Sequence, residues 1–277
     1  MKTGDLMDRL AGRTRSLVMG IVNVTPDSFS DGGRYLDPAR AVAHARELAD
    51  AGADLLDIGG ESTRPGAESV ELAVELERVI PVIEAIASEI DLPISVDTTK
   101  PGVMRAAVAA GAGMINDVSG LREEGAVEAV AETGVPACIM HMQGEPRTMQ
   151  NNPEYRDVVG DIKNFFLERI LACEFAGIPR SSLVLDPGFG FGKTLEHNLE
   201  LLRRLADFAD LGCPVLVGIS RKSMLGKITG RDRPEDRVSA SVAAAVLAAE
   251  RGAAIIRVHD VAETRDALAV VEALGAG

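Results

Sequence analysis

Several polar residues that could bind a small molecule follow short apolar runs of the sequence. Asp97, Asn116 and Asp186 stand at the ends of such runs, and Lys222 lies just beyond another. Carboxylate and amide oxygens accept N–H bonds, often two in parallel, while an ammonium group donates to carbonyl oxygens and ring nitrogens. The set therefore suits the edge of a flat heterocycle rich in N–H and C=O groups, such as a nucleobase or a pterin.

A second group of residues in similar positions favours a phosphate ligand. Together they supply one neutral oxygen and several cationic donors, the groups that bind phosphate and pyrophosphate. A metal here would be Mg²⁺, which takes few protein oxygens and completes its shell with water and substrate phosphate. Asn23 is the candidate ligand, with an ordinary strand-end hydrogen bond as the alternative. The group consists of Asn23, Arg64, Arg221, Arg257 and His259.

The glycine-rich segment GFGFGKT, residues 188–194, resembles two nucleotide-binding motifs and matches neither. A phosphate-binding loop would need glycine where Pro187 stands, and a dinucleotide fingerprint would need glycine where Lys193 stands. We therefore expect only a tight turn, which exposes Phe189 or Phe191 toward the mouth of the site.

Two other connections, NVTPDSFSDGG over 23–33 and GGESTRPG over 59–66, are long and rich in turn-forming residues. Phe29 and Arg64 lie in these segments with no core to fill. We therefore expect the two segments to act as mobile lids. His141, within MHMQGEP, is either a site residue or a packed histidine at a strand end.

The elements that must position these residues alternate regularly. Eight short apolar runs are separated by segments with helical spacing of apolar residues. Continuous apolar runs are typical of strands buried on both faces. The pattern predicts an α/β fold, a single (β/α)8 TIM barrel with its site at the carboxyl ends of the strands, and an open doubly wound sheet is the alternative. The predicted strands are 17–22, 55–58, 94–96, 114–115, 137–140, 183–185, 215–219 and 254–258.

Length and charge limit the remaining possibilities. The chain has 277 residues and a net charge of −13, and we expect one domain over 1–277 with the barrel proper over about 17–274. The acidic balance argues against nucleic-acid and anionic-membrane partners, which bind clustered positive charge. No apolar stretch approaches the ~18 residues of a membrane span. The N-terminus lacks a signal peptide and the three cysteines are scattered, so we expect a cytoplasmic protein.

Taken in order, the strings after the predicted strands resemble the dihydropteroate synthases of the folate pathway. The resemblance covers residues from about 18 to about 274 and supplies a motif at every strand end. Each string alone is weak evidence, whereas the ordered set is specific. The strings are MGIVNVTPDSFSDGG, DIGGESTRPG, ISVDTTK, INDVSG, MHMQGEPRTMQ, LDPGFGFGK, LVGISRKSMLG and IIRVHDV.

The resemblance implies a (β/α)8 barrel that condenses 6-hydroxymethyl-7,8-dihydropterin diphosphate with 4-aminobenzoate and releases diphosphate, with Mg²⁺ as cofactor. It also implies residue roles. The pterin would be bound by Asp97, Asn116, Asp186 and Lys222; the diphosphate by Asn23, Thr63, Arg64, Arg257 and His259, with Asn23 also the metal ligand. The aminobenzoate would be bound by Thr63, Arg64, Pro65, Phe191, Lys222 and Ser223. Phe29 and Asp31 fall in the first mobile loop, and the catalytic set would be Arg64, Asp97, Lys222, Arg257 and His259.

The implied reaction is dissociative and SN1-like. Diphosphate leaves a carbon attached to an electron-rich pterin ring, which can share the developing positive charge. Mg²⁺ and cationic side chains would stabilise the leaving group, while Asp97 and Asp186 would favour the cationic ring. The aminobenzoate nitrogen is already nucleophilic near neutral pH, so we nominate no general base. The resemblance also predicts that sulfonamides compete for the aminobenzoate pocket.

Two other functions remain open at this point. A methyltetrahydrofolate:corrinoid methyltransferase would keep the pterin residues but would not need Arg64, Arg257 or His259. A non-catalytic paralogue would bind pterin without turnover. The family forms homodimers, and small residues over 239–250 allow that helix to pack on the barrel, on a second subunit or on both. The residues before Leu17 lie outside the motifs and receive no role.

Overall fold

The computed structural model describes residues 4–25, 38–62, 67, 69–145 and 148–275. Eight parallel strands are hydrogen-bonded in the order β6-β5-β4-β3-β2-β1-β8-β7. The barrel closes between β6 and β7 through a bridge that pairs Leu185 with Val215. The predicted (β/α)8 barrel is confirmed. The strands are β1 Leu17–Asn23, β2 Leu55–Gly59, β3 Ile94–Asp97, β4 Met114–Asp117, β5 Ala137–Met140, β6 Leu183–Asp186, β7 Leu216–Val217 and β8 Ile255–Val258.

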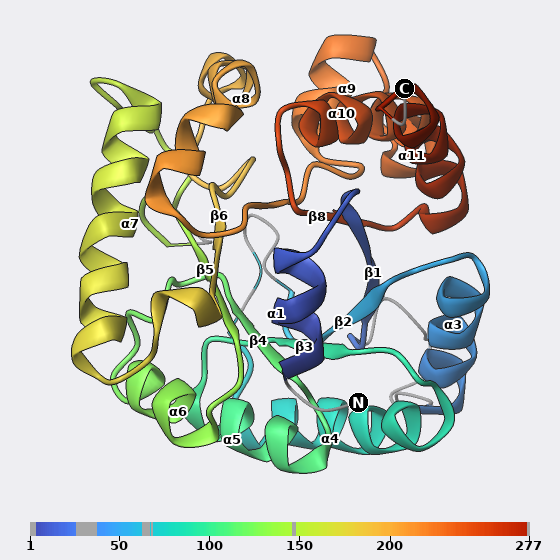
Figure 1. The fold of residues 1–277 in the computed structure, drawn as a ribbon, viewed down its shortest axis with the longest axis vertical. Helices are drawn as coiled ribbons and strands as arrows, with labels where there is room; N and C mark the ends of the chain where they lie inside the picture. Colours follow the sequence, from blue (N-terminus) through green and yellow to red (C-terminus); the bar gives the residue numbers. More distant parts are fainter. Residues whose placement is uncertain (1–3, 26–37, 63–66, 68, 146–147, 276–277) are drawn as a thin grey trace.

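Helices surround the strands as the alternating pattern predicts, and Figure 1 shows α3 to α11 as a ring outside the sheet. Their packing on the outward side chains of the strands makes the larger hydrophobic core. The α-helices are α1 Gly4–Ala11, α3 Pro38–Asp50, α4 Leu72–Glu89, α5 Pro101–Ala110, α6 Ala126–Thr133, α7 Val158–Phe175, α8 Leu195–Arg203, α9 Ser223–Thr229, α10 Val238–Glu250 and α11 Val261–Gly275. Short 3₁₀ segments lie at η1 Arg180–Ser182, η2 Leu205–Leu211 and η3 Pro234–Arg237.

Local sequence sets several helix ends. Asp157 caps α7 by accepting a hydrogen bond from Val159 N. Thr194 and His197 begin α8 with a capping box: the Thr194 hydroxyl accepts from His197 N at 3.2 Å, and Thr194 N donates to His197 Nδ1 at 3.3 Å. Gly111 follows α5 at φ 120°, a conformation that disfavours residues with a Cβ. These caps fix where each helix leaves the barrel wall.

The amino end of the barrel is closed by α1, which lies in front of the strands in Figure 1. Leu6 and Leu10 are buried against the inward residues of the strands, including Met19 and Leu55. The residues before Leu17 lie outside the sequence motifs, so no role was predicted for them. The structure assigns them part of the core, because a barrel interior open at one end would leave its apolar side chains in water.

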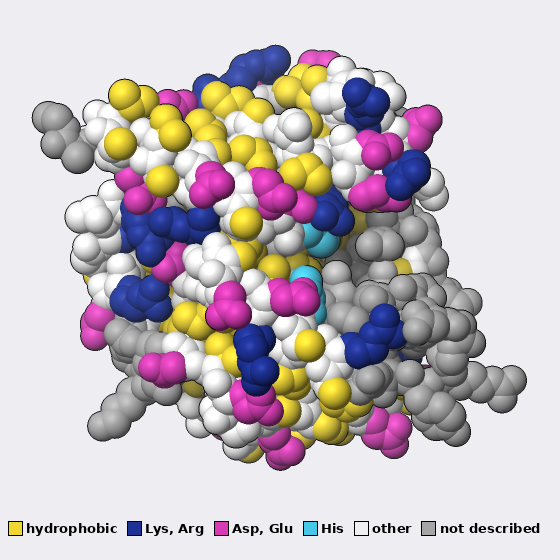
Figure 2. Space-filling model, turned by 90° about the vertical axis from the view of Figure 1, so that its right-hand side faces the viewer, with side chains coloured by type: hydrophobic (Ala, Val, Ile, Leu, Met, Phe, Trp, Pro, Cys, Tyr) yellow, Lys and Arg dark blue, Asp and Glu magenta, His cyan; other side chains and the backbone are white. Residues whose placement is uncertain are grey.

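The helix α10 turns its small residues toward the barrel. Ser241, Ala244, Ala245 and Ala248 are buried along one face, which corresponds to the barrel-packing alternative. Among the described helices, none is long and apolar enough to cross a membrane. On the face drawn in Figure 2, basic and acidic side chains alternate without a broad field of either sign.

Candidate active site

A network of charged side chains meets inside the barrel near the carboxyl ends of the strands. Arg257 of β8 is at its centre: Nε donates to Asp57 Oδ2 at 2.6 Å, and Nη2 donates to Asp97 Oδ2 at 2.9 Å. Asn116 Nδ2 donates to the same Asp57 oxygen at 3.1 Å. All three partners of this arginine network are buried. Four side chains from four strands are thereby fixed relative to one another.

Strand register explains why these side chains meet. Pairing sets Gly59 beside Asp97 and Asp97 beside Asn116, so neighbouring strands end at matching levels. Alternate residues of a barrel strand point inward, and Asp57 is two residues before Gly59. Asp57 therefore points into the barrel beneath Asp97, within reach of Arg257.

Asp57 was missing from the predicted site residues. One signal could have revealed it: a carboxylate inside an apolar run predicted to be buried on both faces needs a partner of opposite charge. The sequence does not say which cation that is, because Arg257 lies 200 positions away.

The turn after β7 directs the side chains of two consecutive cations, Arg221 and Lys222, to different partners. Arg221 has a left-handed backbone with φ 58°, uncommon for a residue other than glycine. Its N–H donates to Ser241 Oγ and its carbonyl accepts from Arg237 Nη1, both at 2.9 Å. The Arg221 guanidinium pairs with Asp260 through Nε at 3.0 Å, whereas Lys222 faces the barrel. Arg221, grouped by sequence with the phosphate ligands, is thus held in an ion pair at the end of β8.

Lys222 meets the glycine-rich turn that follows β6. Its Nζ donates to the Phe189 carbonyl and lies 4.6 Å from the centre of the Phe191 ring. Asp186 Oδ1 accepts from Gly188 N at 2.7 Å. Phe189 is fully buried, whereas Phe191 is partly exposed, so the aromatic residue offered to a ligand is Phe191.

Burial moves the pKa values of two of these groups close to neutral pH. Loss of water contact raises the pKa of Asp97 to about 7, with Arg257 opposing the rise and Asp57 adding to it. Burial also lowers the pKa of Lys222 to about 8, against the attraction of Asp186. The pKa of Asp186 is raised by burial in turn. The charges of these groups will therefore respond to a ligand that donates or accepts hydrogen bonds.

Arg257 keeps its charge in the same surroundings. Burial acts to lower its pKa, but the carboxylates of Asp57, Asp97 and Asp186 raise it above its ordinary range. The centre of the site therefore holds a permanent cation between carboxylates, which can turn part of its charge to an anionic ligand.

Other predicted residues lie around this network. His259 follows β8, and its Nδ1 is 3.0 Å from Ser220 Oγ, which also accepts from His259 N at 3.2 Å. Asn23 ends β1 beside Gly59. Ser223 is exposed at the start of α9. These positions surround the carboxyl end of the barrel, and the roles assigned to them stay predictions.

Five predicted residues lie outside the described part of the chain. Their proposed roles in the diphosphate site, the aminobenzoate site and the mobile loops stay predictions. They are Thr63, Arg64 and Pro65 in the second long connection and Phe29 and Asp31 in the first.

His141, left open between two roles, is packed beside the site. It is 7% exposed, its Nδ1 is 3.0 Å from Lys193 Nζ, and its ring meets that of Phe165 edge-on at 5.0 Å. Burial and the nearby Lys193 charge lower the His141 pKa to about 2, so the ring is neutral at physiological pH. This environment corresponds to the packed strand-end histidine.

Comparison with known proteins identifies the family of this site. Residues 19–259 match the family described as pterin binding enzyme. The dihydropteroate synthase of Escherichia coli K12 is 57% identical over 256 residues, which cover 92% of this chain and 90% of that protein. The chain belongs to the dihydropteroate synthase family. Its members are transferases, so the resemblance noted in the sequence and the enzyme class are both confirmed.

Structures of dihydropteroate synthases agree in fold. The Xanthomonas albilineans enzyme with 4-aminobenzoic acid has a TM-score of 0.91 and 57% identity over 97% of this chain and 98% of that chain. A second structure of that enzyme, with 7,8-dihydropteroate, has a TM-score of 0.87 and 54% identity over the same shares. The Yersinia pestis enzyme with a sulfonamide drug has a TM-score of 0.90 and 52% identity over 95% of each chain.

Proposed function

We propose that the chain joins 6-hydroxymethyl-7,8-dihydropterin diphosphate to 4-aminobenzoate, giving 7,8-dihydropteroate and diphosphate. The observation that carries this proposal is the buried contact of Arg257 with Asp57 and Asp97. It sets a permanent cation beside pterin-type acceptors at the strand ends, as a substrate with a heterocycle and a diphosphate requires. Family membership supports the same reaction.

The pterin would lie along Asp97, Asn116, Asp186 and Lys222. A carboxylate can accept two parallel N–H bonds from an aminopyrimidinone edge, and Asp97 and Asp186 are both available in ionised form once the ligand donates to them. Lys222 would donate to a ring nitrogen or carbonyl. Because Asp97, Asn116 and Asp186 are buried, their hydrogen bonds discriminate strongly against molecules that lack the matching group.

The diphosphate would lie toward Asn23, Arg257 and His259. In the described part of the chain, no group of three His, Cys, Asp or Glu gathers to hold a metal. The single amide oxygen of Asn23 nevertheless fits Mg²⁺ that shares its coordination with substrate phosphate and water. When bound, Mg²⁺ would neutralise charge on the departing diphosphate. Thr63 and Arg64 are the remaining candidates for this end of the substrate.

The chain's own residues then favour a dissociative, SN1-like path. As the carbon–oxygen bond to diphosphate breaks, positive charge develops on the pterin and negative charge on the leaving group. Asp97 and Asp186 stabilise the first, and Arg257 and His259 stabilise the second. The electron pair of the aminobenzoate amine forms the new C–N bond, and its proton passes to solvent or to the leaving diphosphate. No general base is needed.

The aminobenzoate would bind beside Phe191, Lys222 and Ser223. Thr63, Arg64 and Pro65 are the further candidates that the family resemblance supplies. The partly exposed Phe191 ring, with the Lys222 ammonium over it at 4.6 Å from its centre, offers a flat apolar surface beside a cation. An aromatic carboxylate fits such a surface. Sulfonamides, which have a similar outline, should compete at this position.

The deciding experiment incubates the purified protein with pterin diphosphate, 4-aminobenzoate and Mg²⁺ and measures dihydropteroate and diphosphate. Both products should form in equal amounts, and the Asp186→Ala variant should form neither at a comparable rate. Pterin binding without turnover would indicate the non-catalytic paralogue. Methyl transfer from methyltetrahydrofolate to a corrinoid, without dihydropteroate formation, would indicate the methyltransferase alternative.

We also propose that the enzyme is a cytoplasmic homodimer. A dimer is supported by an exposed apolar stripe on α7, where Leu167, Leu171 and Phe175 are 42%, 52% and 92% exposed. Residues spaced by four share one face of a helix, so a second copy could cover all three at once. A reducing compartment is supported by the free, buried thiols of Cys138, Cys173 and Cys213.

A further inference from the structure

The turn after β6 is held by an unusual series of side-chain contacts. Gly188, Gly190 and Gly192 have φ angles of 69°, 82° and 61°, in the left-handed region that glycine adopts readily. Three such glycines in five residues give the free segment many conformations, so ordering it has a high entropic cost. Side-chain contacts can offset this cost by holding the segment in one conformation.

Each of five consecutive carbonyls in this turn, from Phe189 to Lys193, accepts a hydrogen bond from a side chain. The donors come from the β7–α9 turn, from the segment between β5 and α7, from the turn itself and from α8. The pairs are Lys222 Nζ to Phe189 O, Gln150 Nε2 to Gly190 O, Lys193 Nζ to Phe191 O at 2.9 Å, Tyr155 Oη to Gly192 O at 2.8 Å and Asn198 Nδ2 to Lys193 O at 3.4 Å.

Close packing beneath the turn makes its position sensitive to these contacts. A Cβ on Gly188 would come within 1.9 Å of the His141 carbonyl oxygen, and one on Gly192 within 2.5 Å of the Gln143 carbonyl oxygen. The turn therefore rests directly on the backbone that follows β5. Phe191, in the middle of the turn, packs beside a cluster that includes Met140, Met142 and Met149.

Lys193 donates to the Phe191 carbonyl itself, but its Nζ also contacts His141, so removing it would disturb a second element. The Tyr155 hydroxyl makes its hydrogen bond to the turn alone. Tyr155 is partly buried, its ring meets His197 edge-on at 4.9 Å, and its hydroxyl holds the carbonyl next to Phe191 in sequence. Gln150 is exposed, so water can replace its contact. Lys222 is itself a predicted substrate ligand.

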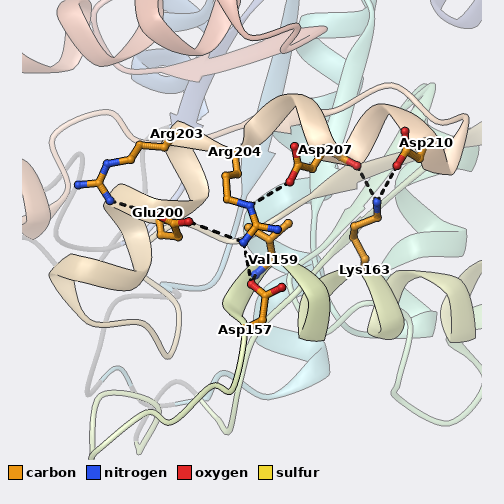
Figure 3. Close-up of polar contacts among 8 residues, drawn as sticks. All are labelled: Asp157, Val159, Lys163, Glu200, Arg203, Arg204, Asp207 and Asp210. Atoms are coloured by element: carbon orange, nitrogen blue, oxygen red, sulfur yellow. Dashed lines mark hydrogen bonds and ion pairs between the residues drawn. The ribbon is translucent and has the colours of Figure 1, made fainter.

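A surface network keeps Tyr155 near the turn. Arg204, which follows α8, donates to Asp157 at 2.9 Å and to Asp207 at 2.9 Å. Lys163 of α7 donates to the Asp207 carbonyl and the Asp210 carboxylate, both at 2.9 Å. Figure 3 shows these contacts between α7 and the α8–η2 segment. Asp157 is two residues after Tyr155, so the network ties the tyrosine's segment to the helix that carries Asn198.

We propose that Tyr155 is a positioning residue for the aminobenzoate half-site. It orders the glycine-rich turn through the Gly192 carbonyl and so holds the Phe191 ring against Lys222. The role of Phe191 in binding aminobenzoate rests on the proposed function above. In this role Tyr155 acts through the turn and not by contact with a substrate.

The first test compares Tyr155→Phe with Ser16→Ala. Both changes remove one hydroxyl that donates to a backbone carbonyl, at 2.8 Å for Tyr155 and 2.7 Å for Ser16, which lies at the amino end of the barrel. Tyr155→Phe should raise the KM for 4-aminobenzoate about three- to ten-fold, the effect of one lost hydrogen bond. The Kd for pterin diphosphate should change less than two-fold, and Ser16→Ala should change neither constant.

The second test asks whether Tyr155 acts through Phe191. In a Phe191→Ala background, Tyr155→Phe should no longer affect the KM for 4-aminobenzoate. An undiminished effect in that background would overturn the proposal, as would a Tyr155→Phe variant that leaves this KM unchanged or weakens both substrates equally.

A measurement without substrates separates this proposal from the proposed function. Hydrogen exchange of a peptide covering 186–199 should be faster in Tyr155→Phe than in the wild type and unchanged in Ser16→Ala. Unchanged exchange in Tyr155→Phe would overturn the ordering role. If the wild-type protein makes no dihydropteroate, the proposed function fails, whatever the exchange experiment gives.

Discussion

Asp57 and Arg257 lie 200 residues apart in sequence and share a 2.6 Å hydrogen bond inside the barrel. Asp57 binds Nε of the arginine, and Asp97 accepts a hydrogen bond from its Nη2. A guanidinium is planar, so two carboxylates bound to different nitrogens set its orientation as well as its position. The Asp57 carboxylate also accepts from Asn116, which links Arg257, a proposed diphosphate ligand, to a proposed pterin ligand.

We expect Asp57→Asn to lower kcat/KM about 10- to 100-fold, because the neutral amide cannot hold both Arg257 and Asn116 with charge-assisted hydrogen bonds. Steady-state kinetics with each substrate varied will measure the loss. Ser95→Ala is the matched control: Ser95 is buried on β3, and its hydroxyl has no hydrogen-bond partner among the described residues. A wild-type kcat/KM in Asp57→Asn would contradict the positioning role.

Pterin binding should depend on pH in a bell-shaped manner. Asp97 has a pKa near 7, so below that pH the carboxyl is protonated and must lose its proton to accept two N–H bonds. Lys222 has a pKa near 8, so above that pH it loses the ammonium that donates to the ring. Affinity should therefore fall at both extremes, by up to about ten-fold per pH unit.

The ligand for this measurement is 6-hydroxymethyl-7,8-dihydropterin, because it has no phosphate that titrates in the same range. Calorimetry between pH 5.5 and 9.5 would give its Kd. Asp97→Asn should remove the acidic limb of the profile, and Lys222→Met the alkaline limb. An unchanged profile in either variant would assign that limb to another group.

Variants on the two sides of the site should separate by substrate. Asp97→Ala and Asp186→Ala should weaken binding of pterin diphosphate, because each removes an acceptor for the heterocycle. Arg64→Ala should chiefly lower turnover or aminobenzoate affinity. Binding of each substrate can be measured by calorimetry and turnover by diphosphate release. An equal loss of pterin binding in all three variants is the result that contradicts the assignment.

Truncation of the buried side chain in α1 should reduce stability without altering the site. Leu10 is fully buried, so Leu10→Ala should lower the free energy of unfolding by about 2–5 kcal/mol. Leu274→Ala removes the same atoms from a side chain that is 80% exposed. It should change the free energy of unfolding by less than about 0.5 kcal/mol. Urea unfolding would measure both. A stable Leu10→Ala protein would mean that the barrel end does not depend on α1.

The proposed dimer can be tested on α7. Leu171→Ser and Phe175→Ser together should give a monomer by light scattering, because they replace two of the three side chains of the exposed stripe. Leu247→Ser on α10 is the control, since its side chain is 39% exposed on a helix whose buried face packs on the barrel. A wild-type monomer would refute the homodimer, and a dimer that survives the α7 changes would locate its interface elsewhere.

Much of the candidate site was predictable from local sequence. Asp97, Asn116 and Asp186 follow apolar runs, and a parallel barrel collects the carboxyl ends of its strands at one face. The same rule could not choose between Phe189 and Phe191, which differ only in how the turn rotates. It also left His141 open, because its partner Lys193 lies 52 positions away.

Apolar periodicity and motifs are local properties of the chain, and they were enough to predict the order of elements, the barrel and the family. The pairing of the buried charges, the exposure of Phe191 instead of Phe189, and the closure of the amino end by α1 became known only from the folded chain. Asp57 is an example. A buried carboxylate requires a cation, but which cation it pairs with depends on which side chain reaches it across the barrel. Such contacts arise from closure of the sheet, and no local pattern contains them.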